Sequence, residues 1–269
     1  MSRTSTLAAG LLAAAGAHLA HRVLTARVRS PRWQRTNHAG DPVTLLEGPA
    51  YDAGAALGAA VGGPAGVVAT LGSGAFGALD DLAGDGASKG LRGHLGAAAQ
   101  GRVTTGLVKI VGIGATGLVA AALADRARGD VGPVDTLVGG AVVAGAANLA
   151  NLLDLRPGRA LKATVLAAAP LLLPASRPGS AAAAAATGAA LGVLAPDLAG
   201  RAMLGDTGAN AAGALLGTAL VGRAGRRGRL VALAVLAALT LASERVSFTE
   251  VIESTPGLRE LDAWGRPAR

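Results

Sequence analysis

Long apolar runs, separated by short stretches rich in Arg or Asp, dominate the hydropathy pattern of this chain. An α-helix needs about 20 predominantly apolar residues to cross a bilayer core. With a window of that length, the pattern predicts spans at approximately 5–26, 52–79, 103–124, 134–153, 160–176, 179–199, 207–223 and 229–243. We therefore expect an all-α, polytopic transmembrane bundle of about 8–10 spans. It forms a single integral membrane domain over 1–269, with 244–269 as a polar cytoplasmic tail.

The composition supports a membrane protein and excludes several other classes. Hydrophobic residues make up 51% of the chain, charged residues 16%, and the mean hydropathy is +0.45. Much of the apolar content is Ala and Gly, which let helices approach closely in lipid. With no Cys, disulfides and thiolate metal sites are excluded. The net charge is +8, but the chain has few aromatic residues on which bases could stack. We therefore expect it to bind anionic lipid and a nucleotide substrate rather than nucleic acid.

Lys and Arg side chains set the expected orientation, because loops rich in them usually stay in the cytoplasm. Such loops fall at 22–35, after residue 81 and at 156–162, which puts the neighbouring acidic motifs at the cytoplasmic face. Two observations resist this scheme. A single crossing by 52–79 would separate the first Arg-rich loop from Asp80, and an Arg-rich stretch at 223–229 would lie outside. A helix break at Gly62-Gly63-Pro64 would turn 52–79 into a hairpin and remove the first conflict.

Three acidic motifs lie at the ends of apolar runs: Asp80-Asp81, Asn148-Leu-Ala-Asn151-Leu-Leu-Asp154 and Gly205-Asp206-Thr207-Gly208. An ionised Asp at membrane depth is costly unless it pairs, binds a metal or reaches water, so such residues are functional candidates. On a helix, the two Asn and the Asp would follow one face at spacings of three. Carboxylates beside a Gly-containing helix start suit Mg²⁺ and phosphate groups. The motifs together predict magnesium-assisted phosphoryl transfer.

The order of these motifs, with an Arg-rich first loop running from Arg35-Thr-Asn-His38 to Glu47-Gly48-Pro49, resembles the polyprenyl-phosphate N-acetylhexosamine-1-phosphate transferases. That family includes phospho-N-acetylmuramoyl-pentapeptide transferase and undecaprenyl-phosphate N-acetylglucosamine-1-phosphate transferases. The resemblance covers approximately 30–217. It implies a Mg²⁺-dependent plasma-membrane enzyme of cell-wall biogenesis that moves a phospho-N-acetylhexosamine from a UDP-sugar to polyprenyl phosphate and releases UMP.

The resemblance also implies roles for individual residues. Asp80, Asp81 and Asp206 would be catalytic, with Asp81 and Asp206 as metal ligands. Asn148, Asn151 and Asp154 would match the family's nucleotide-side motif. Independently of the resemblance, the basic residues near the motifs are further substrate-binding candidates: Lys89, Arg92, Lys109 and Arg156. For Lys109 the alternative is a side chain that extends to the membrane interface.

The chain departs from the family in two places. Leu155-Arg156-Pro157-Gly158-Arg159 stands where the family has a Gly-Leu-Asp-Gly type of sequence, and no His follows His94, although the family carries a late His cluster. A catalytically impaired relative that binds lipid phosphate or an envelope-assembly partner is therefore an alternative. A third reading is an intramembrane aspartyl protease using Asp52 and Asp206. The oligomeric state stays open, with a homodimer as one option.

Overall fold

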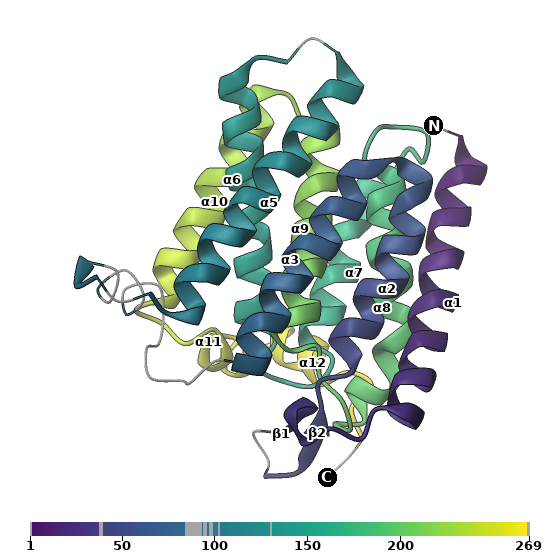
Figure 1. Ribbon diagram of the computed structural model, residues 1–269, viewed down its shortest axis with the longest axis vertical. Coiled ribbons are helices and arrows are strands. Elements are labelled where there is room, and N and C mark those ends of the chain that lie inside the picture. The colour runs from purple at the N-terminus through teal and green to yellow at the C-terminus, as the bar shows by residue number, and fades with distance from the viewer. Residues whose placement is uncertain are drawn as a thin grey trace.

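Nine long helices run along the bundle in the part of the chain that the computed structural model describes, which is residues 2–37, 40–83, 93, 96, 99–101, 103–129 and 131–267 (Figure 1). They are α1 (Arg3–Arg27), α2 (Glu47–Ala59), α3 (Pro64–Ala83), α5 (Thr105–Arg128), α6 (Pro133–Leu153), α7 (Arg159–Leu172), α8 (Ser180–Leu198), α9 (Gly205–Arg223) and α10 (Arg226–Ser243). Short elements lie at one end: η1 (Pro31–Trp33), the antiparallel strands β1 (Gln34–Thr36) and β2 (Pro42–Thr44), α11 (Phe248–Ser254) and α12 (Leu258–Ala263). The expected all-α class is confirmed.

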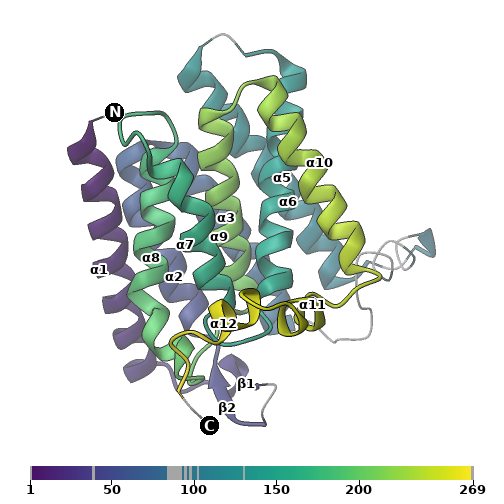
Figure 2. The same cartoon turned by 180° about the vertical axis from the view of Figure 1, so that it is seen from behind.

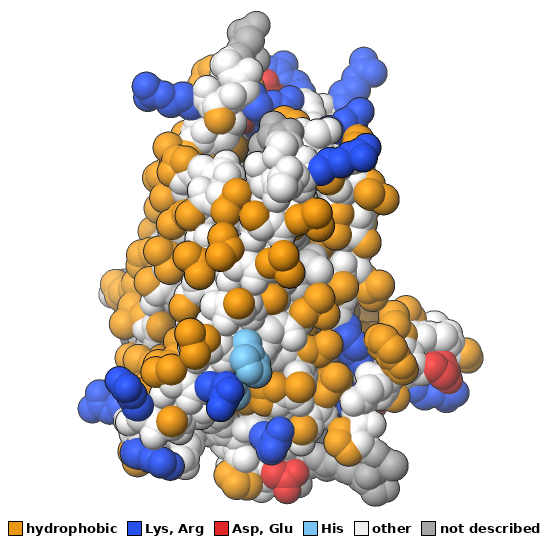
Figure 3. Space-filling view, turned by 90° about the vertical axis from the view of Figure 1, so that its right-hand side faces the viewer, with side chains coloured by type: hydrophobic (Ala, Val, Ile, Leu, Met, Phe, Trp, Pro, Cys, Tyr) orange, Lys and Arg blue, Asp and Glu red, His pale blue; other side chains and the backbone are white. Residues whose placement is uncertain are grey.

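Four of these helices, α1, α5, α6 and α8, are long and apolar enough to cross a membrane. The pair α10 and α11 passes the same test, although it is bent by 93°. On the face in Figure 3, hydrophobic side chains form a broad band, and Lys and Arg gather at its two ends. Leu7, Leu11 and Leu19 of α1 are exposed within an apolar helix. This distribution fits a bilayer around the bundle, whereas the full number of spans stays a prediction.

The apolar run at 52–79 is two helices rather than one. Helix α2 is followed by the short helix η2 (Ala60–Gly62), and Gly63 then adopts φ +107°, a conformation that favours glycine, before α3 begins at Pro64. The predicted hairpin is therefore confirmed. Helix α3 returns toward the first Arg-rich loop, where the Arg35 guanidinium donates to the Asp81 carbonyl oxygen. The loop and the first acidic motif thus lie at the same end of the bundle.

Helix α9 lies at the centre, with most of its residues buried. Its neighbours approach through small residues. Gly213 lies against the Ala146 carbonyl group of α6, and Gly77 of α3 lies against the Asp206 carbonyl group, so neither position has space for a Cβ atom. This close helix packing places the start of α9 among the acidic motifs and agrees with the packing expected of membrane helices.

At the opposite end, carboxylates pair with two of the arginines that seemed to oppose the predicted orientation. The buried Arg229 guanidinium pairs with Asp125 of α5, and Arg226 pairs with Asp135 at 2.6 Å. These contacts join α5, α6 and α10. Two of the four arginines at 223–229 thus have carboxylate partners, and the orientation of the bundle in a membrane stays a prediction.

We expect Gly213→Val to lower the unfolding free energy by about 1–3 kcal/mol, because the new side chain must push α6 away from α9. Gly114→Ala is the matched control, since a Cβ there meets no neighbouring atom. That variant should be neutral or slightly stabilising. Thermal unfolding of both variants in detergent tests the packing, and an unchanged midpoint for Gly213→Val would contradict it.

Candidate functional site

Lys109 of α5 joins two of the acidic motifs. Its ammonium group donates to Asp80 Oδ2 at 2.8 Å and to Asp206 Oδ2 at 2.5 Å. The three side chains are only 17–25% exposed, so the contact lies within the protein rather than in bulk solvent. Lys109 therefore faces the candidate site instead of extending to the membrane interface. One ammonium between two carboxylates leaves this group with excess negative charge.

Asp81 caps the start of α9 with both carboxylate oxygens. Its Oδ1 accepts from the Asp206 N–H at 3.0 Å, and its Oδ2 accepts from the Thr207 N–H at 2.9 Å and from Thr207 Oγ1 at 2.6 Å. A carboxylate is favourable there because the first N–H groups of a helix carry partial positive charge. The two neighbouring aspartates thus point to different partners, as expected for adjacent positions on a helix. Asp80 meets a cation and Asp81 holds α9.

The strand β2 helps to position the segment before α9. Thr44 N–H donates to the Arg201 carbonyl oxygen, and Met203 N–H donates to the Thr44 carbonyl oxygen. Gly205 then adopts φ +61°, and a Cβ atom there would lie 3.0 Å from Asp81 Oδ2. Glycine at this position therefore permits both the turn and the close contact with Asp81.

A polar cavity of about 1210 Å³ lies at the same end of the bundle; Met203 lines it, but Asp80, Asp81, Lys109 and Asp206 do not. Asp154, the residue that follows α6, lines it and is 7% exposed. Burial raises the pKa of Asp154 well above its usual range, Asp197 adds to the effect, and the backbone amide of Gly205 acts in the opposite direction. The cavity therefore brings the second motif close to the third.

The other predicted substrate-binding residues have different positions. Asn148 donates to Thr240 Oγ1 of α10 at 3.1 Å, and neither Asn148 nor Asn151 lines the polar cavity. Asn148 and Asn151 share a face of α6 at a spacing of three, whereas Asp154 follows the last residue of the helix with φ −80° and ψ 53°. Of the three, only Asp154 lines the polar cavity, so the structure does not bring them together there.

Basic residues were also expected to contact substrate. Arg156 lines the cavity, and its guanidinium Nη2 lies 3.0 Å from Glu253 Oε1 of α11. Lys89 and Arg92 lie outside the described residues. The substrate roles of all these residues stay predictions.

The C-terminal segment closes one side of the cavity instead of extending away as a loose tail. Figure 2 shows α11 and α12 lying across the end of the bundle. Arg159 of α7 forms a two-pronged contact with Asp262, at 2.8 and 3.0 Å, and Lys162 donates to the Leu261 and Trp264 carbonyl oxygens. Ser247, Thr249 and Glu250 line the cavity wall. No local pattern in the sequence indicates these contacts, because the partners lie about 100 positions apart.

Sequence reasoning missed two buried carboxylates. Glu47 at the start of α2 is fully buried, and Asp197 near the end of α8 is 1% exposed. An ionisable residue at the end of an apolar run was an available signal for Asp197. Within the described ranges, no group of three or more Asp, Glu or His side chains is arranged as a metal site.

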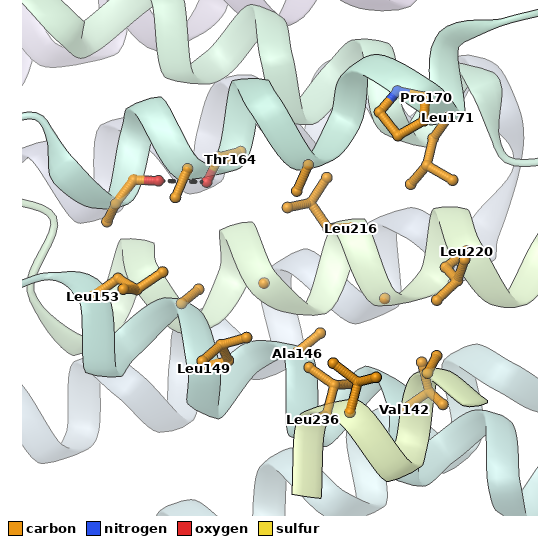
Figure 4. A pocket seen from close by; sticks show the side chains of 18 residues that line it. Val142, Ala146, Leu149, Leu153, Thr164, Pro170, Leu171, Leu216, Leu220 and Leu236 are labelled. Atoms are coloured by element: carbon orange, nitrogen blue, oxygen red, sulfur yellow. Dashed lines mark hydrogen bonds between the residues drawn. The ribbon is translucent and has the colours of Figure 1, made fainter. Parts of the chain in front are cut away.

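An apolar groove of about 400 Å³ lies between α6, α7, α9 and α10 (Figure 4). Leu153 lines one end and Pro170 the other, with Leu149, Leu216 and Leu236 between them. Leu153 lines the groove, and the next residue, Asp154, lines the polar cavity. An apolar groove near a polar cavity suits an amphiphilic ligand.

No protein-family model matches the chain, and no curated protein matches it. The chemistry of the site is therefore the basis for assigning a function. Carboxylates, one ammonium group and the start of a buried helix meet at one end of the bundle, beside cavities of opposite polarity. Such a site can bind phosphate groups in the presence of a cation.

We expect Lys109→Met to lower the unfolding free energy by about 1–3 kcal/mol, because Asp80 and Asp206 would lose their common cation. Adding Asp206→Asn to that variant should recover part of the loss, since one unpaired charge disappears. A double-mutant cycle from denaturant unfolding measures this coupling. Strictly additive effects would show that the contact does not contribute to stability.

Asp262→Asn should release the C-terminal segment, because Arg159 would keep a buried charge without its carboxylate partner. We expect faster cleavage within 244–267 by a limiting amount of protease. Glu260→Gln is the control, since the Arg259–Glu260 pair is more than half exposed and contributes little. Equal cleavage rates for the two variants would contradict the role assigned to the buried pair.

Proposed function

We propose that this protein is a membrane glycosyl-1-phosphate transferase that moves a phospho-N-acetylhexosamine from a UDP-sugar to a polyprenyl phosphate. The observation that carries the proposal is the meeting of Asp80, Asp81 and Asp206 at the start of α9, with Lys109 between two of them. These residues belong to motifs whose order resembles the polyprenyl-phosphate transferases. Their contacts join α3, α5 and α9, so these contacts depend on the fold and not only on the order of the motifs.

The carboxylate oxygens of this site suit Mg²⁺, both as ligand atoms and in their total negative charge. Carboxylate oxygens are its preferred protein ligands, and one ammonium group does not balance three carboxylates. Asp206 and Asp80 would hold the ion; Asp81, a metal ligand by resemblance, already accepts three hydrogen bonds from α9 and would orient Asp206 instead. When bound, Mg²⁺ would neutralise charge on the diphosphate.

The apolar groove supports a lipid acceptor. Its Leu-rich lining is open between α6, α7 and α10, and its Leu153 end adjoins the polar cavity through Asp154. A prenyl chain would lie along the groove, and its phosphate would lie near the polar end. A small soluble acceptor would not need this apolar surface for binding.

The polar cavity supports the UDP-sugar as donor. It has room for a nucleotide-sized ligand, and Arg156 could exchange its contact with Glu253 for a phosphate oxygen. The lipid phosphate oxygen would then bond to the β-phosphorus of the donor while the bond from that phosphorus to the bridging oxygen breaks. UMP leaves with that oxygen. Lys109 would stabilise the negative charge on the transferred group, and most of the catalysis would be positioning.

A non-catalytic relative that binds lipid phosphate is the second candidate. This alternative is favoured because Lys109, Asp81 and Arg156 already form hydrogen bonds with other residues of the protein. An aspartyl protease has less support. Asp52 lies against Gly74 of α3, whereas Asp206 pairs with Lys109.

The proposal predicts UMP release when purified protein receives UDP-N-acetylglucosamine or UDP-N-acetylmuramoyl-pentapeptide, polyprenyl phosphate and Mg²⁺. Asp206→Asn should lower the rate by about 100- to 1,000-fold, because charge stabilisation is lost. Asp135→Asn, at the far end of the bundle, is the control and should retain activity. Ligand binding without UMP release would support the second candidate, and peptide cleavage independent of Mg²⁺ would support the protease.

A further inference from the structure

Three buried carboxylates meet beside the polar cavity, outside the group around Lys109. Glu47 comes from the start of α2, Asp154 from the end of α6 and Asp197 from the end of α8. All three are at least nine-tenths buried. Glu47 faces Asp197, and Asp154 is near enough to both to act on them electrostatically. The three carboxyl groups therefore lie close to one another, largely shielded from solvent.

Glu47 and Asp197 lie close enough to share a hydrogen bond when one of them is protonated. When all are ionised, oxygen atoms of all three residues lack a hydrogen-bond donor among the described residues. They are Glu47 Oε1 and Oε2, Asp154 Oδ2 and Asp197 Oδ2. Asp197 Oδ1, in contrast, accepts from the Gly158 N–H at 3.0 Å. Buried carboxylate oxygens without a partner are unfavourable unless a cation or a proton neutralises them. Asp154 and Asp197 both line the polar cavity, so an ion would have to enter from there.

The nearest basic side chains are already engaged. Lys162 donates to three main-chain carbonyl groups of the C-terminal segment, and Arg266 pairs with Asp262 and donates to the Pro157 carbonyl oxygen. The cavity lining has more acidic than basic side chains, namely Asp41, Asp154, Asp197, Glu250 and Glu253 against Arg156 and Arg266. This balance attracts cations, including those that accompany a diphosphate.

We propose that the floor of the polar cavity binds a divalent cation through Asp154 Oδ2 and Asp197 Oδ2, with Glu47 as the adjacent carboxylate. The site is separate from the group of Asp80, Asp81 and Asp206, and it does not depend on the transferase function. Two carboxylates with water completing the shell is a common way to hold Mg²⁺. Within the described ranges, no three Asp, Glu or His side chains are arranged around one ion, so only two carboxylates are assigned as ligands.

The test is a Mn²⁺ titration of the full-length protein in detergent, in which the electron paramagnetic resonance signal of free Mn²⁺ gives the number of ions bound per chain. Asp197→Asn and Asp154→Asn should each bind one ion fewer than the parent chain. The same loss should occur when Asp206 is also changed to Asn. Glu47→Gln should weaken the binding of this ion by about tenfold or more, because a neighbouring charge is lost.

Glu250→Gln is the matched control, since it removes one charge from the same cavity lining but lies away from the buried group. It should bind as many ions as the parent chain. Size-exclusion profiles and unfolding midpoints show whether each variant is folded, and Glu47→Gln keeps the test valid if Asp197→Asn does not fold. The proposal is overturned if folded Asp197→Asn or folded Glu47→Gln binds Mn²⁺ as the control does. That result would mean that protons shared between the carboxyl groups, and not a cation, neutralise them.

UMP release by the same preparations separates this inference from the proposed function. Loss of one ion in Asp197→Asn, with no UMP release by the parent chain, would keep the cation site and remove the transferase. UMP release that depends on Asp206, with unchanged Mn²⁺ binding in Asp197→Asn, would keep the transferase and overturn the cation site.

Discussion

The capping of α9 by Asp81 is the contact on which the candidate site depends. Both oxygens of this carboxylate bind the first residues of α9, and the neighbouring Asp80 reaches Lys109. Because Lys109 also binds Asp206, three helices are joined by a few polar contacts in an otherwise apolar bundle. Such contacts are strong where water is scarce, and each leaves a costly charge when its partner is removed. The same residues therefore combine structural and chemical roles.

The small side chains of the chain make this arrangement possible. Gly77 lets α3 approach the Asp206 backbone, and Gly213 lets α6 approach α9 from the other side. With larger residues at these positions, the carboxylates of α3 and α9 would lie farther apart. The Ala and Gly content that predicts close packing of membrane helices thus also determines how closely the acidic motifs can meet. Packing and site chemistry depend on the same property of the sequence.

Much of the fold could be predicted from the hydropathy pattern. The predicted runs correspond to the helices, and the conflict over 52–79 correctly indicated the break at Gly63. The grouping of Asp80 and Asp206 was also expected from motif order. The contact of Asn148 with α10 could not be predicted, because it depends on where α6 ends and which helix lies beside it. Likewise, the pairing of Arg159 with Asp262 joins residues far apart in the chain, and no local pattern indicates such a contact.

The most direct measurement is an experimental structure of the protein with Mn²⁺ and a UDP-sugar, in which anomalous scattering locates the metal. The account predicts Mn²⁺ density between the Asp206 carboxylate and the donor diphosphate, with Lys109 beside the transferred phosphate. Absence of Mn²⁺ density at Asp206, or a donor bound away from the start of α9, would contradict the account.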